Sequence, residues 1–85
     1  MFTKNYFIKQ LKEEYQNLQI WKDNITGQVI ELEFIRCQYL NENISNLEYE
    51  EEYANIQYYI NLYEAHAEEA KDTIITLLQI IDSLS

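Results

Sequence analysis

The stretch that decides the fold runs from Tyr49 to Leu84 and reads YEEEYANIQYYINLYEAHAEEAKDTIITLLQIIDSL. Apolar residues recur in it every seven positions, and a second apolar set interleaves with the first at alternating steps of four and three. The first set is Tyr49, Ile56, Tyr63, Ala70, Leu77 and Leu84, and the second is Tyr53, Ile60, Ala67, Ile74 and Ile81. A stripe of this period predicts one long helix that is buried along a single seam.

The first half of the chain carries the same pattern less regularly. The residues spaced by seven are Leu11, Leu18, Ile25, Leu32 and Tyr39. The intermediate positions are filled by Phe7 or Ile8, Tyr15, Trp21, Val29 and Ile35. The spacing continues through DNITGQ, residues 23–28, where a loop would shift it. We therefore expect one helix over about residues 4–41, in which Gly27 costs about 1 kcal/mol. A break near Asn24–Gly27, which would give three helices, is the alternative.

The segment NENIS, residues 41–45, predicts a tight turn between the two helices. Ser45 and Glu48 have the spacing of a capping box, in which a serine hydroxyl and a glutamate side chain satisfy free backbone N–H groups. Ile44 and Tyr49 stand at the two positions of a hydrophobic staple. A turn this short joins antiparallel neighbours only.

The composition agrees with an all-helical fold. The chain has no proline and one glycine, whereas a β protein needs turn residues every 8–12 positions or so. A chain of 85 residues forms one domain with a small core. We predict an all-α fold in which two long antiparallel helices, about residues 4–41 and 46–84, form a coiled-coil hairpin.

Several apolar residues fall off the predicted seam and indicate an interface. A contiguous patch of exposed apolar side chains usually marks a contact surface. Two hairpins joined through such patches would form a four-helix bundle, so we expect a homodimer, in which the two copies run either parallel or antiparallel. Docking onto a different protein is the alternative. The candidate interface residues are Ile30, Phe34, Tyr58, Tyr59 and Leu62.

The negative charge belongs to the second half of the chain. The formal net charge is −9, from 15 acidic and 6 basic residues. The charges of residues 1–41 cancel, so residues 42–85 carry the whole excess. Direct binding to nucleic acid depends on Lys and Arg and is not expected. A protein partner with a basic surface is favoured instead. The candidate partner-binding acids are Glu42, Glu50, Glu51, Glu52, Glu64, Glu68, Glu69 and Asp72.

Residues that carry catalysis or bind metals are scarce. Cys37 and His66 are single residues of their kinds, and the predicted hairpin holds them apart, so they form no nucleophile–base pair. We expect Cys37 to be a small buried hydrophobic residue. We expect His66 to be a seam or surface residue rather than a metal ligand. The sequence therefore predicts no enzyme activity, no metal and no cofactor.

The cysteine count and the N-terminal segment bear on location. A single cysteine excludes an internal disulfide and fits a reducing compartment. The segment MFTKNYFIKQL lacks the long apolar core of a signal peptide. No window of the sequence approaches the ~18 apolar residues of a membrane span. We expect a soluble, cytoplasmic protein that does not associate with a membrane.

In size, acidity and lack of catalytic residues, the chain resembles the small acidic inhibitors of phages and mobile elements, including anti-CRISPR and DNA-mimic proteins. This resemblance rests on the composition of the whole chain rather than on a motif. It implies that carboxylates and tyrosines of the second helix occupy a basic groove where nucleic acid should lie. The alternatives are a helical-hairpin partner of a secretion system, similar to the WXG-type proteins, and a phage scaffold or assembly subunit.

Overall fold

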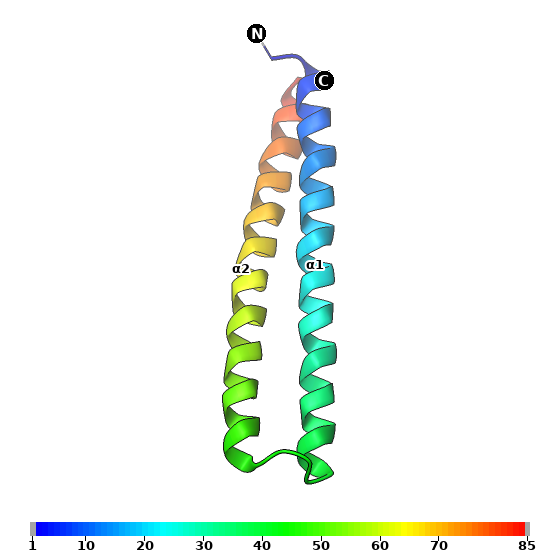
Figure 1. Cartoon of the computed structure of the whole chain (residues 1–85). Coiled ribbons are helices and arrows are strands. Elements are labelled where there is room, and N and C mark those ends of the chain that lie inside the picture. The colour runs from blue at the N-terminus through cyan, green and yellow to red at the C-terminus, as the bar shows by residue number, and fades with distance from the viewer. Residues whose placement is uncertain (1, 85) are drawn as a thin grey trace.

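The structure, a computed structural model that describes residues 2–84, is a hairpin of two antiparallel helices (Figure 1). Helix α1 spans Lys4–Leu40 and helix α2 spans Asn46–Ser83. Both ends of the chain lie at one end of the molecule and the turn lies at the other. The rod measures 61 × 16 × 14 Å. The predicted fold is confirmed, and each helix ends one residue earlier than expected.

Helix α1 continues without a break through the segment that resembled a loop. The range Asn24–Gly27 is helical, so the alternative with three helices is wrong. The hydroxyl of Thr26 donates a hydrogen bond to the carbonyl of Lys22 at 3.1 Å, as a side chain does within a regular helix. A β-carbon placed on Gly27 would meet no atom within 4 Å, so tight packing does not explain the glycine. The uninterrupted heptad spacing therefore outweighs the weak helix propensity of this segment.

Helix α1 ends in a Schellman motif. The backbone N–H of Asn43 donates to the carbonyl of Gln38 at 2.9 Å, and that of Glu42 donates to the carbonyl of Tyr39 at 3.0 Å. Glu42 has a φ of 61°, the left-handed conformation that glycine usually adopts at this position. The turn therefore reverses the chain through a residue with an unfavourable backbone conformation.

Helix α2 begins at the predicted cap. The Ser45 hydroxyl accepts a hydrogen bond from the backbone N–H of Glu48 at 3.1 Å. It also donates to the Glu48 carboxylate at 3.2 Å, so the glutamate contacts the serine side chain rather than its backbone N–H. Ile44 and Tyr49 both pack against the same core cluster, as expected for a staple. The predicted N-cap and staple at the start of α2 are confirmed, whereas Glu48 meets the Ser45 hydroxyl instead of the backbone N–H that a capping box predicts.

Two clusters of buried side chains hold the helices together. The cluster toward the chain ends contains Leu18, Ala67, Ala70 and Ile74, with Leu11, Trp21 and Ile25 packed against it. The cluster toward the turn contains Ile35, Ile56 and Ile60, with Leu32, Ile44 and Tyr49 beside it. Among residues 2–84, no large side chain is less than 2% exposed. The core is therefore a single thin seam, because each helix has only one neighbour to bury it.

The seam of α1 differs from the predicted one at two positions. Glu14 and Gln28 are half-buried, whereas Tyr15 and Val29, which were expected on the seam, are 50% and 44% exposed. The inward positions between the first set of heptad residues are therefore Phe7, Glu14, Trp21, Gln28 and Ile35, which are spaced by seven throughout. The prediction failed here because it followed apolar residues only and replaced two polar seam residues by their apolar neighbours.

Three further residues are more exposed than expected. Tyr53 and Leu84 belong to the predicted seam of α2 but are 43% and 48% exposed. Cys37, which was expected to be buried, is exposed. It lies two residues after the buried Ile35, on the side of α1 that points away from α2.

Candidate protein-interaction surface

The seam divides the surface of the hairpin into two flanks and two outer ridges. In α1 the a positions are Leu11, Leu18, Ile25, Leu32 and Tyr39, and the d positions are Phe7, Glu14, Trp21, Gln28 and Ile35. In α2 the a positions are Tyr53, Ile60, Ala67, Ile74 and Ile81, and the d positions are Tyr49, Ile56, Tyr63, Ala70, Leu77 and Leu84. Because positions a and d point inward, positions e and b lie on one flank, positions g and c lie on the other, and position f points outward. In an antiparallel pair the e positions of both helices share a flank, and so do the g positions. Shallow hollows in the structure follow this division, because each one joins residues of a single flank from both helices.

One flank, here called the acidic flank, carries carboxylates and apolar side chains but no lysine or arginine among the residues described. Its carboxylates on α1 are Glu13 and Glu31, with the seam residue Glu14 at its edge, and those on α2 are Glu48, Glu52 and Glu69. Its exposed apolar residues are Ile20, Phe34, Tyr59 and Leu62. His66 of α2 belongs to the same flank and is half-buried.

A hollow of about 280 Å³ lies on the acidic flank beside the turn. Phe34, Ile35 and Ile44 form its apolar part. Carboxylates surround this apolar part from both helices, at Glu31, Glu48 and Glu52. Phe34 remains 56% exposed, so its ring is available to a ligand. The hollow therefore combines an exposed aromatic ring with negative charge.

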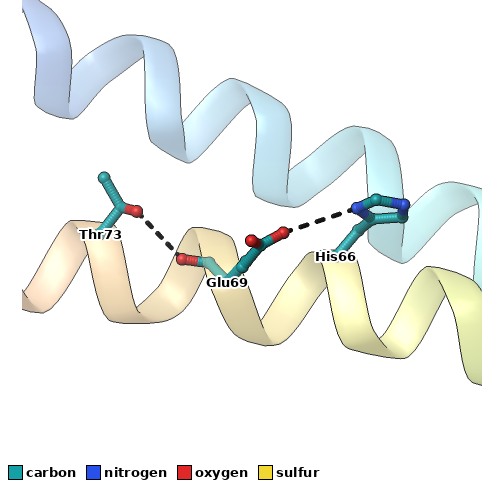
Figure 2. A network of polar contacts seen from close by, with 3 residues as sticks. All are labelled: His66, Glu69 and Thr73. Atoms are coloured by element: carbon teal, nitrogen blue, oxygen red, sulfur yellow. Dashed lines mark hydrogen bonds and ion pairs between the residues drawn. The ribbon is translucent and has the colours of Figure 1, made fainter.

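A second hollow, of about 210 Å³, lies on the same flank nearer the chain ends. The ring of His66 stacks on Trp21, with 4.4 Å between ring centroids and 16° between the planes. The Nδ1 atom of His66 lies 3.7 Å from a carboxylate oxygen of Glu69. Figure 2 shows His66, Glu69 and Thr73 following one another along α2, with the Thr73 hydroxyl donating to the Glu69 carbonyl at 3.1 Å. Glu14 of α1 completes the negative side of this hollow.

Aromatic rings extend from the second hollow toward the first. Trp21 stacks on Tyr63 with centroids 5.8 Å apart, and Tyr63 lies 6.0 Å from Tyr59. Tyr59 meets Tyr58 edge to face at 5.4 Å. Tyr58 stands on the outer ridge of α2 and is 63% exposed. Rigid rings that pack on one another present contact area at a small cost in side-chain entropy, which suits a binding surface.

The opposite flank, here called the mixed-charge flank, carries both signs of charge. Lys22, Glu64, Glu68 and Lys71 line one hollow of about 340 Å³ at its middle. Two ion pairs lie on this flank, Lys71 with Glu68 at 3.5 Å and Arg36 with Glu33 at 3.6 Å. Its exposed apolar residues are Tyr15, Val29, Leu40, Leu47, Ile75 and Leu78.

The predicted partner-binding acids are all exposed, but they do not share one face. Glu52 and Glu69 lie on the acidic flank, while Glu50, Glu64 and Glu68 lie on the mixed-charge flank. The remaining three are Glu51 and Asp72 on the outer ridge of α2 and Glu42 in the turn. The predicted acids of α2 therefore lie on both flanks and on the outer ridge, rather than on one face of the helix.

The predicted apolar interface is divided as well. Phe34, Tyr59 and Leu62 lie on the acidic flank, and Tyr58 stands beside Tyr59 on the outer ridge of α2. Ile30 is 64% exposed on the outer ridge of α1, one helical turn before Phe34. Three of the five residues therefore lie on the acidic flank, and the other two stand on the ridges that adjoin it.

The sequence prediction missed four carboxylates at the acidic flank, Glu13, Glu14 and Glu31 of α1 and Glu48 of α2, which had been assigned to the helix cap alone. The prediction for α1 used the net charge of the first half of the chain, which is zero because its acids and bases are equal in number. Sorting the same charges by heptad position separates them, because the lysines and the arginine of α1 fall at other positions. The signal was present in the sequence once the seam was assigned correctly.

Residues 2–84 contain neither a cluster of metal ligands nor a membrane-spanning helix. Over this part of the chain, no three His, Cys, Asp or Glu side chains are close enough together to hold a metal ion. Cys37 lies on the outer ridge of α1, whereas His66 packs on Trp21, so the two do not meet. In the same range, neither helix has a stretch long and apolar enough to cross a membrane.

Comparison with known proteins leaves the hairpin without an assigned family. No family model matches the chain, and neither a curated protein nor a solved structure matches it. Functional inference therefore rests on the charges, hollows and exposed rings of the two flanks.

Proposed function

We propose that the chain is a non-enzymatic protein-binding module whose acidic flank covers a basic, nucleic-acid-binding surface of another protein. The observation that carries this proposal is the separation of charge between the two flanks. Among residues 2–84 the acidic flank bears carboxylates and no lysine or arginine, whereas four of the six basic residues, Lys12, Lys22, Arg36 and Lys71, fall on the mixed-charge flank. A surface of one sign steers a partner of the opposite sign and disfavours nucleic acid.

The two hollows of the acidic flank suit lysine or arginine side chains. Each places an aromatic ring next to carboxylates, Phe34 beside Glu31 and Glu52 in one and Trp21 beside Glu69 in the other. An arginine can pair its guanidinium with a carboxylate while it stacks on a ring, and a lysine can lay its aliphatic stem on the same apolar surface. The apolar surface and the charge therefore act on the same bound side chain.

The spacing of charge favours covering a basic surface over imitating a DNA duplex. The acidic flank spreads the carboxylates of Glu13, Glu14, Glu31, Glu48, Glu52 and Glu69 along a rod 61 Å long, about one per 10 Å. Double-stranded DNA carries a charge every 1.7 Å or so along its axis. The proposed mechanism is therefore occlusion, in which a few basic side chains of the partner are bound and the nucleic acid is excluded.

The biological role proposed for this activity is inhibition in the cytoplasm, as by the small acidic inhibitors that phages and mobile elements encode. The partner would be a host defence or regulatory protein that handles nucleic acid. We further propose that the hairpin associates with itself to form a four-helix bundle. The thin seam and the exposed Tyr15, Val29, Leu40, Leu47 and Ile75 support this second part.

The test compares two variants with the same change in charge. Glu31→Gln, Glu52→Gln and Glu69→Gln together neutralise the acidic flank, and Glu50→Gln, Glu64→Gln and Glu68→Gln together neutralise the mixed-charge flank. A partner is first captured from host extract with the natural chain at low salt. Affinity of each variant for this purified partner is then measured by calorimetry, beside displacement of nucleic acid from it.

The acidic-flank variant should bind at least about tenfold more weakly, and the mixed-charge variant should bind like the natural chain. High salt should release the partner, because screening weakens contacts between charges near a surface. Equal losses in both variants would contradict the assignment of the flank. A partner that stays bound through high salt and keeps its nucleic acid would contradict occlusion by charge.

A further inference from the structure

On the mixed-charge flank, α1 carries mainly basic residues and α2 carries mainly acidic residues. The side contributed by α1 carries Lys12, Lys22 and Arg36, with Glu33 as its one acid. The side contributed by α2 carries Glu50, Glu64, Glu68 and Asp82, with Lys71 as its one base. Each helix therefore presents an excess of one sign on this flank, and the two excesses are opposite.

Exposed apolar side chains stand at both ends of the same flank. Near the chain ends, Tyr15 of α1 is 50% exposed and Ile75 of α2 is 53% exposed. Near the turn, Leu40 of α1 is 70% exposed and Leu47 of α2 is 65% exposed. The charged hollow that contains Lys22 lies between these two apolar ends. A surface with apolar side chains toward both ends and charged side chains between them can pack against a second surface that has the same arrangement.

We propose that a second copy of the chain covers the mixed-charge flank, with both turns at the same end of the dimer. In this arrangement the two-fold axis runs parallel to the helices, and α1 of each copy packs against α2 of the other. The inference rests on the self-association put forward above and goes beyond it by assigning the face and the direction. All neighbouring helices in the resulting four-helix bundle are antiparallel.

Symmetry fixes the register of this dimer. A two-fold axis parallel to the helices leaves every height along the rod unchanged, so a residue of α1 meets the α2 residues that lie at its own height in the second copy. Lys22 then meets the second copy's Glu64, Glu68 and Lys71, which line the same hollow as Lys22 within one hairpin, so it faces two carboxylates and one ammonium group. At one end Tyr15 meets the second copy's Ile75, and at the other end Leu40 meets its Leu47. Opposite charges thus face each other in the middle of the contact, and apolar side chains face each other at these two points toward its ends.

The other arrangements bring like charges together. If the turns lay at opposite ends, α1 would pack on α1 and α2 on α2, so Lys22 would meet the second copy's Lys22 and Glu64 would meet its Glu68. Packing of the acidic flanks on each other is disfavoured, because they hold carboxylates and no lysine or arginine among residues 2–84. The proposed dimer therefore leaves an acidic flank exposed on each of its two outer sides.

Disulfide trapping between two different variants tests the arrangement directly. In a Cys37→Ser background, one preparation carries Tyr15→Cys and a second carries Ile75→Cys, and the two are mixed and oxidised with oxidised glutathione. The proposal expects a covalent heterodimer from this mixture. A matched mixture of Tyr15→Cys with Val29→Cys should give little heterodimer, since those positions meet only when the turns lie at opposite ends.

Charge reversal supplies an independent measurement. Lys22→Glu places a carboxylate opposite two glutamates of the second copy, and it does so twice in a symmetric dimer. We expect the dissociation constant of the dimer, measured by sedimentation equilibrium, to rise at least about tenfold. Lys9→Glu makes the same change of charge on the outer ridge of α1 and should leave the dissociation constant near its natural value. Combining Lys22→Glu with Glu68→Lys should restore most of the lost affinity.

The outcomes separate this inference from the proposal on which it rests. A chain that stays monomeric at high micromolar concentration would overturn both self-association and the assigned face. A dimer that traps Tyr15→Cys with Val29→Cys, and tolerates Lys22→Glu, would keep self-association and overturn the arrangement proposed here. Circular dichroism of each variant shows that the hairpin is folded, which is expected because Tyr15, Lys22, Val29 and Ile75 are all exposed.

Discussion

At the scale of single residues, Glu42 is the least expected feature of the hairpin. It was predicted only as an acid in the turn, and its left-handed backbone, with φ of 61°, has no signal in the sequence because glycine usually fills this position. The hydrogen bonds of the Schellman motif hold it there, from Glu42 to Tyr39 and from Asn43 to Gln38. A side chain with a β-carbon is crowded in this conformation, so the turn loses stability at Glu42.

Glu42→Gly should therefore raise the free energy of unfolding by about 1 kcal/mol. Urea denaturation followed by circular dichroism measures this difference. Glu42→Ala is the matched control, because it removes the carboxylate but keeps the β-carbon, and it should give no comparable gain. If alanine stabilised the hairpin as much as glycine, the charge of Glu42 rather than its backbone would be the cause.

At the scale of the helices, the sequence predicted α2 more accurately than α1. In α2 every seam position is apolar, so the apolar period and the true period coincide, and only Tyr53 and Leu84 near the ends are more exposed than expected. In α1 two seam positions are polar, Glu14 and Gln28, and a search for apolar residues shifted to Tyr15 and Val29. Counting every seventh residue from Phe7, whatever its polarity, would have placed Glu14 and Gln28 on the seam.

The polar seam residues of α1 also explain which residues of the candidate surface could be predicted from the sequence. Phe34, Tyr59 and Leu62 were identified because they fall off the seam by any assignment, and the structure places them on one flank. Glu14 and Glu31 were missed because their flank can be recognised only after the phase of α1 is known. Sequence patterns therefore identified the exposed apolar residues, while sorting the acids by face required the packed pair of helices.

The polar seam residue Gln28 leads to a prediction for α1. Polar residues at seam positions lower stability and help to fix the register of the two helices. Gln28→Leu should raise the free energy of unfolding by about 1 kcal/mol, since Gln28 is half-buried and a leucine there would bury additional apolar surface. Gln16→Leu, on the exposed outer ridge of the same helix, is the control and should change stability little. Equal gains from both variants, measured by thermal denaturation, would show that helix propensity rather than burial is responsible.

At the scale of the whole molecule, shape and burial set the conditions for stability. A rod of 61 × 16 × 14 Å exposes most of its side chains, and its buried core consists of Leu18, Ile35, Ile56, Ile60, Ala67, Ala70, Ile74 and Leu77. Small domains with so little buried surface often depend on a second subunit. The excess negative charge adds repulsion within the single hairpin. Folding and self-association are therefore expected to be coupled.

Coupled folding and association predicts that the midpoint of thermal unfolding rises with protein concentration. Each tenfold increase in concentration adds about 1.4 kcal/mol to the free energy of unfolding of a dimer, which should move the midpoint by a few degrees. Calorimetry over a wide concentration range measures the shift. Lys22→Glu, which weakens the proposed dimer, should lower the midpoint at every concentration, whereas Lys9→Glu should leave it near its natural value. A single cooperative transition at the same temperature for all concentrations would show that one thin seam is enough to hold the hairpin, and the exposed apolar residues of the mixed-charge flank would then need another explanation.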